Sequence, residues 1–138
     1  MENKKKKDES VSLTLLVSAG RVSSDLMEFI LEIVKRFNLE IYLTDAQNIR
    51  LNNISASDIE PIKSELSMKG VVFKQKGQFP YPRVCVGEPH CNLGLIDTER
   101  VSRLILEKFS SREKVKQKFK IALSACTLGC SGVRTTDI

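Results

Sequence analysis

The chain has 138 residues, a mass of 15.5 kDa, a hydrophobic fraction of 41% and a net charge of +5. This size fits one domain, or one domain and part of another, and the hydrophobic fraction predicts an aliphatic core rather than a disordered chain. No apolar run approaches the roughly 20 residues that cross a bilayer, and the basic start "MENKKKKDES" has no apolar signal-peptide core after it. The sequence thus argues against a membrane span and a secretory signal, and predicts a cytoplasmic protein with reduced cysteines.

The positive charge is concentrated at the start of the chain, where four consecutive lysines occupy positions 4–7. No aromatic residue is interleaved with these lysines, so a platform on which nucleic-acid bases could stack is absent there. We therefore expect residues 1–10 to form a disordered, solvated basic tail, and we expect no nucleic-acid partner.

A strand and a helix are predicted next. The run "SLTLLVS", residues 12–18, is apolar and rich in strand-forming residues, and Gly20 ends it. Ser23 or Ser24 can cap a helix, because apolar residues recur behind them at helical spacing. These apolar positions are Leu26, Phe29, Ile30, Ile33, Val34 and Phe37.

Two more strands and a second helix follow. "EIYLTD" (40–45) and "NIRLNNI" (48–54) alternate polar and apolar residues, as half-buried strands do. Ser57 precedes Glu60 by three residues, which is the capping-box spacing, and it predicts a helix that ends near Met68.

A fourth strand, "VVFKQ", is predicted at residues 71–75. The resulting order β-α-β-β-α-β is that of the ferredoxin-like split βαβ unit. We therefore predict an α+β protein in which residues 11–76 form a ferredoxin-like half-domain.

Residues 77–84 contain Gly77, Pro80 and Pro82 and are predicted to be a linker. The remaining segment, residues 85–138, is predicted to contain a helix over 96–109 and a short strand in "FKIALSA" (119–125). The predicted apolar face of that helix consists of Val101, Leu104 and Ile105.

The last residues, from Thr135 to Ile138, have the composition of an approach to another strand, yet no further element follows. A cysteine loop that the next element does not close would leave backbone groups unpaired. We therefore expect the sequence to be truncated at its C-terminus.

Four cysteines form two loop-borne pairs. Cys85 and Cys91 are spaced as C-x5-C, and Cys126 and Cys130 as C-x3-C. Four thiolates suit zinc or an iron–sulfur cluster. The C-x5-C spacing is wide for a zinc knuckle and natural for a larger cluster, so the spacing favours a cluster over zinc or purely structural cysteines, which remain alternatives.

The cysteine pattern resembles that of the sirohaem-dependent nitrite and sulfite reductase family, whose signature is C-x5-C followed by C-x3-C. The stretches "CVGEPHCNLGLIDTE" and "KFKIALSACTLGC" are similar to the family's two cysteine loops. The resemblance implies that residues 85–138 are a partial α+β module for a [4Fe–4S] cluster and sirohaem. It also implies that Cys85, Cys91, Cys126 and Cys130 bind the cluster, and that Cys130 bridges it to the sirohaem iron.

The resemblance further implies a basic pocket for a small oxyanion, sulfite or nitrite, because both the substrate and sirohaem are anionic. Lys118 and Lys120 match the family's K-x-K beside the substrate and would be catalytic, lying on one face of a strand. Arg50, Arg83 and Arg134 are further candidates for contacts with the anion or with the carboxylates of the cofactor.

The chain departs from the family at "LTDAQN", residues 43–48, where the family usually reads L-T-x-R-Q. Ala46 stands where an anion-binding arginine is expected, and Asp45 adds a negative charge beside it. Arg50 is expected to project to the same face as Ala46 and to compensate in part.

These features predict a sulfite or nitrite reductase that carries out a six-electron reduction, as a small or partial family member. The alternatives are a non-catalytic [4Fe–4S] electron carrier and a zinc-stabilised binding module. An electron donor is required as a partner. Larger family members contain two copies of this module, so a homodimer or a partner subunit is expected to complete the pocket.

Overall fold

The computed structural model describes residues 10–138. The predicted basic tail and its lysine run lie outside the described residues, apart from Ser10.

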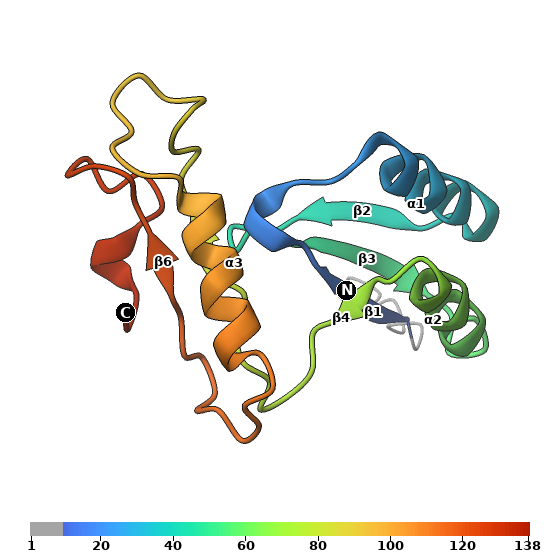
Figure 1. The fold of residues 1–138 in the computed structure, drawn as a ribbon. Helices are drawn as coiled ribbons and strands as arrows, with labels where there is room; N and C mark the ends of the chain where they lie inside the picture. The colour runs from blue at the N-terminus through green and yellow to red at the C-terminus, as the bar shows by residue number, and fades with distance from the viewer. Residues whose placement is uncertain (1–9) are drawn as a thin grey trace, which may run out of the picture.

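The first half of the chain forms an antiparallel four-stranded sheet in the order β2-β3-β1-β4, and two helices cover one face of it (Figure 1). This order confirms the predicted ferredoxin-like fold. The elements are β1 (Val11–Leu16), α1 (Ser24–Phe37), β2 (Glu40–Leu43), β3 (Ile49–Ile54), α2 (Ile59–Met68) and β4 (Val72–Phe73).

The core lies between this sheet and its helices. On β3, Ile49 and Leu51 are buried and Arg50 is exposed on the open face, as strand alternation requires. Ile54 is also buried, because the alternation is broken at Asn53, which has a φ of +65°. The predicted apolar face of α1 is confirmed, with Ile30 and Ile33 buried. The other four predicted positions of that face pack against the same core: Leu26, Phe29, Val34 and Phe37.

The two helices begin differently. Ser23 caps α1, because its hydroxyl oxygen accepts a hydrogen bond from the Leu26 N–H at 3.3 Å. The capping box predicted for α2 is wrong. Asp58 already has helical backbone angles at the cap, and Ser57 donates its hydroxyl to the Asp58 carboxylate instead.

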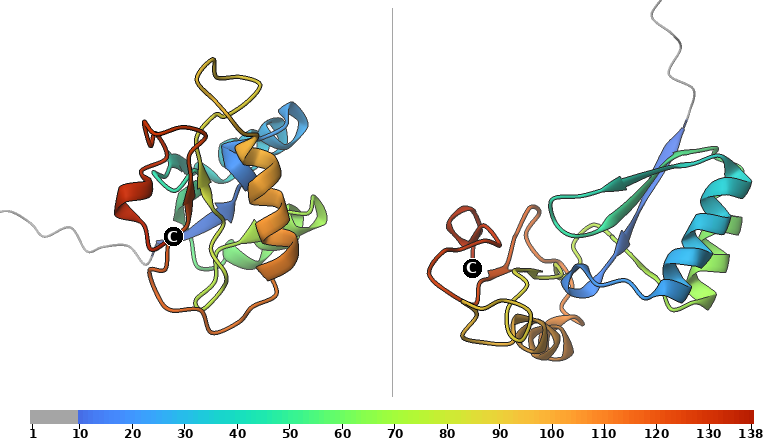
Figure 2. Two further views of the ribbon diagram at one scale, coloured as in Figure 1. Left: turned by 60° about the vertical axis from the view of Figure 1, so that its left-hand side comes forward. Right: turned by 90° about the horizontal axis from the view of Figure 1, so that it is seen from above.

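The second half of the chain is built on two very short parallel strands, β5 (Arg83–Val84) and β6 (Ala122–Leu123), beside α3 (Thr98–Phe109) (Figure 2). A 3₁₀ turn, η2 (Val133–Thr135), follows the second cysteine pair, and another, η1 (Ser18–Gly20), follows β1 in the first half of the chain. The strand predicted over 119–125 is therefore reduced to two residues, because the chain is still turning at residues 117–118. β5 also lies within the predicted linker.

The predicted apolar face of α3 is only partly correct, because Leu104 is 55% exposed. The buried residues of this helix are Thr98 and Ser102. Thr98 donates its hydroxyl to the Cys85 carbonyl oxygen at 2.8 Å. Small side chains thus let α3 approach the backbone of the first cysteine loop closely.

Each helix within residues 10–138 is too short or too polar to cross a membrane.

Candidate anion pocket and cysteine loops

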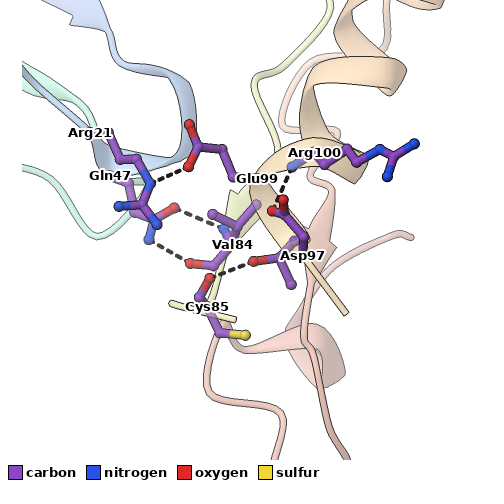
Figure 3. Close-up of polar contacts among 8 residues, drawn as sticks. Arg21, Gln47, Val84, Cys85, Asp97, Glu99 and Arg100 are labelled. Atoms are coloured by element: carbon purple, nitrogen blue, oxygen red, sulfur yellow. Dashed lines mark hydrogen bonds and ion pairs between the residues drawn. The ribbon is translucent and has the colours of Figure 1, made fainter. Parts of the chain in front are cut away.

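The side chain of Gln47 joins the half-domain to β5. Its Nε2 donates to the Val84 carbonyl oxygen at 2.7 Å, and its Oε1 accepts from the Val84 N–H at 2.8 Å (Figure 3). Gln47 has a φ of +61°, which turns its side chain out of the β2–β3 connection. The carboxamide thus satisfies the main-chain N–H and carbonyl of Val84, as a neighbouring strand would.

The β2–β3 connection that carries Gln47 is itself held by two polar side chains. The buried Asn48 accepts the Val17 N–H on its Oδ1 at 3.0 Å, and its own N–H donates to Thr44 Oγ1 at 3.0 Å. These bonds fix the turn at both ends, and so they fix the positions of Asp45 and Ala46 between them.

A second contact between the two halves is the ion pair of Arg21 and Glu99 at the start of α3 (Figure 3). Both side chains are about two-fifths exposed, at 42% and 40%. An ion pair of this exposure contributes little to stability, so the two partly buried hydrogen bonds of Gln47 position the halves more strongly.

A cavity of about 390 Å³ lies where the β2–β3 connection, residues 74–83 and residues 115–121 meet. It brings together Ala46, Arg83 and the Lys118–Lys120 segment, which are distant from one another in sequence. The cavity therefore joins the family's expected arginine position to the K-x-K segment.

The charged residues of the cavity wall are mostly positive. The cations are Lys74, Lys76, Arg83, Lys116, Lys118 and Lys120. Asp45 is the acidic residue among those that line the cavity. This excess of positive charge suits an anionic ligand.

The predicted strand geometry of the two lysines is wrong. Lys118 lies in a turn with a φ of +64°, and Lys120 precedes β6. The Lys120 backbone is fixed by Asp137, whose carboxylate accepts the Lys120 N–H at 2.9 Å and whose N–H donates to the Lys120 carbonyl at 3.0 Å. A turn, rather than strand alternation, therefore brings both lysines to the cavity.

The three candidate arginines lie in different places. Arg83 lines the cavity, and its guanidinium lies 3.4 Å from the Gly132 carbonyl oxygen. Arg50 bonds Ser12 at 2.7 Å on the exposed face of the sheet and is absent from the cavity wall, so it does not compensate for Ala46 there. Arg134 is exposed in η2.

The two cysteine loops begin next to each other, because β5 and β6 run parallel and lead into them. The Cys85 N–H donates to the Leu123 carbonyl at 3.0 Å, and Leu95 donates to the Ala125 carbonyl at 3.1 Å. The Ala125 N–H donates to the Cys85 sulfur at 3.1 Å. An N–H bond of this kind stabilises a thiolate and tunes a cluster that it binds.

The chemistry of the donors fits a cluster, since all four cysteines are free thiols on adjacent loops. Cys130 is exposed, and the other three are partly buried. Within residues 10–138, however, no three His, Cys, Asp or Glu side chains are close enough to share a metal ion. The four-cysteine ligand set therefore stays a prediction.

Sequence reasoning missed the residues that position this site, namely Gln47, Asn48 and Thr98. The polar run after Leu43 could have indicated a turn held by its own side chains, because it connects two strands and contains no glycine. The hydrogen-bond partners of Asn48 and Gln47 lie 31 and 37 residues away, and this run could not indicate them.

The comparisons with known proteins agree with the fold of the half-domain. Residues 3–69 match the model of the nitrite/sulfite reductase ferredoxin-like half domain. A coenzyme F420-dependent sulfite reductase of Methanocaldococcus jannaschii is 36% identical over 110 residues, which is 79% of this chain and 18% of that protein.

This chain belongs to the nitrite and sulfite reductase family. The NAD(P)H nitrite reductase large subunit of Klebsiella oxytoca is 26% identical to this family member over 136 residues, which is 96% of the chain and 14% of that subunit. The fold is similar to that of dissimilatory sulfite reductase I, with a TM-score of 0.69 and 17% identity, over 88% of this chain and 29% of that structure. The chain thus spans less than a third of the length of each of these proteins.

Proposed function

We propose that this chain contributes the oxyanion pocket and the cluster-binding loops of a sulfite or nitrite reductase. The observation that carries the proposal is the cavity in which the β2–β3 connection meets Lys118 and Lys120. The same short parallel strands that border this region lead into Cys85 and the second cysteine pair. The basic pocket is lined by residues at and before the starts of β5 and β6, and the two thiol loops follow the ends of the same strands. Two-residue strands therefore connect the pocket to the loops.

Within this proposal, Lys118, Lys120 and Arg83 bind the oxyanion through charge-assisted hydrogen bonds. The two lysines also donate the protons that leave with the substrate oxygens as water. Arg50 and Arg134 lie outside the cavity and would contact carboxylates of the cofactor. Ala46 leaves space where the family usually has an arginine.

Cys85, Cys91, Cys126 and Cys130 would hold a [4Fe–4S] cluster, and Cys130 would connect it to sirohaem. When bound, the cluster and the tetrapyrrole supply single electrons to the substrate. The Ala125 N–H at the Cys85 sulfur supports a thiolate there. The exposed position of Cys130 leaves its sulfur accessible to a second group.

The proposal divides the described chain into a half-domain (11–76), a connection (77–84) and a partial cofactor domain (85–138). It also requires an electron donor, and a second copy or a partner subunit to complete the pocket. Sulfite and nitrite are both consistent with the names of the relatives.

The test is an absorption spectrum of the anaerobically purified protein, with iron, sulfide and zinc measured on the same sample. We expect tetrapyrrole bands and about four irons and four sulfides per chain. Cys85→Ser should lose the cluster, whereas Cys130→Ser should lose the coupling between cluster and haem. Thr127→Ser, an exposed change in the same loop, is the control and should retain both.

Two other results would overturn the proposal. Iron and sulfide without tetrapyrrole bands would indicate an electron carrier. Zinc with a colourless spectrum, and a fold lost to chelators, would indicate a structural module. Full activity of Cys130→Ser would contradict the bridging role alone.

A further inference from the structure

The positive charge of the cavity is unevenly distributed. Its cations belong to residues 74–83 and 116–120. The β2–β3 connection contributes Asp45, Ala46 and Asn48, none of which is positively charged. An anion held by Lys118 and Lys120 therefore shares the cavity with a carboxylate from this connection.

The Asp45 carboxylate is free to interact with a ligand. It forms no ion pair within 4.0 Å in the part of the chain that the structure describes, although cations line the same cavity. Ala46 beside it has no group that could neutralise it. The hydrogen bonds between Thr44 and Asn48 hold the turn, and so they place the backbone of the exposed Asp45 at the cavity wall.

A carboxylate at this position acts differently on the two substrates considered above. Nitrite at neutral pH is an anion without a proton, so Asp45 only repels it. Hydrogen sulfite is also an anion, but it carries an acidic proton that it can donate to a carboxylate. A charge-assisted bond of this kind offsets the repulsion between the two anions.

We propose that Asp45 is a specificity-determining residue that selects hydrogen sulfite over nitrite in the Lys118–Lys120 cavity. This inference rests on the proposed function, because it requires that the cavity binds a small oxyanion. It deepens that function by naming a protonated anion as the preferred ligand.

The test is equilibrium binding of sulfite and of nitrite, measured calorimetrically slightly below neutral pH, where sulfite is mostly hydrogen sulfite. The variants are Asp45→Asn, which removes the charge at constant size, and Ala46→Arg, which places a cation beside the carboxylate. Glu32→Gln on the exposed surface of α1 removes the same charge far from the cavity and serves as the control.

We expect the wild-type chain to bind hydrogen sulfite more tightly than nitrite. In Asp45→Asn, nitrite affinity should rise roughly fivefold while the preference for hydrogen sulfite falls by a similar factor. Ala46→Arg should weaken the preference in the same direction, and Glu32→Gln should leave it unchanged.

The outcomes separate the two proposals. If both anions bind and the preference is the same in the wild type, Asp45→Asn and Ala46→Arg, the role of Asp45 is wrong and the proposed pocket stands. If neither anion binds to the wild type or to Ala46→Arg, both the pocket and the inference are wrong. If Asp45→Asn fails to fold, the response of Ala46→Arg decides.

Discussion

The Gln47 carboxamide forms both of its hydrogen bonds with the main chain of one residue, Val84, at 2.7 and 2.8 Å. Val84 directly precedes Cys85, and the residue is 4% exposed. One side chain of the half-domain thus fixes the backbone from which the first cysteine loop begins. The position of the loop depends on the half-domain being folded.

Gln47→Ala should destabilise the protein by about 1–3 kcal/mol, because it leaves a buried N–H and a buried carbonyl of Val84 without partners. Urea unfolding measures the loss, and amide exchange at Val84 should accelerate. Gln117→Ala is the control, since the exposed Gln117 side chain forms none of the hydrogen bonds recorded between residues 10 and 138. Equal losses in both variants would contradict the docking role of Gln47.

Gly87→Ala should be more destabilising than Gly70→Ala. Both glycines have a positive φ, +60° and +77°, and the backbone strain of an alanine costs about 1–2 kcal/mol at either position. A Cβ at Gly87 would also lie 2.6 Å from Thr98 Oγ1, whereas a Cβ at Gly70 would meet nothing within 4 Å.

The overlap should add about 1–3 kcal/mol at Gly87, because the first cysteine loop must move away from α3. Thermal unfolding of the two variants measures the difference. Gly87→Ala together with Thr98→Ser keeps the overlapping hydroxyl and should remain destabilised. Indistinguishable stabilities of Gly87→Ala and Gly70→Ala would show that α3 does not pack closely on this loop.

Ser23→Ala should cost about 1 kcal/mol, because it removes the hydroxyl that accepts the Leu26 N–H at the start of α1. Ser57→Ala should change the free energy of unfolding by less than about 0.5 kcal/mol, because the exposed Ser57 hydroxyl bonds only the Asp58 carboxylate. Urea titrations of the two single variants provide the comparison. A larger loss of stability for Ser57→Ala than for Ser23→Ala would contradict the structure and support the predicted capping box.

Lys118→Ala and Lys120→Ala should each weaken sulfite binding roughly fivefold to tenfold, because each removes a positive charge from the cavity wall. Lys63→Ala is the control, since Lys63 lies on α2 and pairs with Glu60. Calorimetric titration at low salt measures the affinities, and added salt should reduce the differences. Equal sulfite affinities of Lys118→Ala, Lys120→Ala and Lys63→Ala would show that sulfite does not bind in this cavity.

The sequence by itself determined the half-domain. Its strands and helices have unambiguous periodicity, with Ile30 and Ile33 on one face of α1 and Ile49 and Leu51 on one face of β3. The spacing of apolar residues along each element directly predicts which of its faces is buried. The cysteine spacing and the K-x-K segment, together with the resemblance that they carry, likewise identified the family.

Only the tertiary structure decided how the site is assembled. The carboxamide bonds of Gln47, the asymmetry of charge around Asp45 and the close packing of Thr98 under the first cysteine loop all join segments that are far apart in sequence. Two-residue strands such as β5 and β6 bury too little to leave a periodic signal, and the turn at Lys118 breaks the alternation that the sequence predicted. Single hydrogen bonds and charges between distant segments have no period, so the sequence could not have placed them.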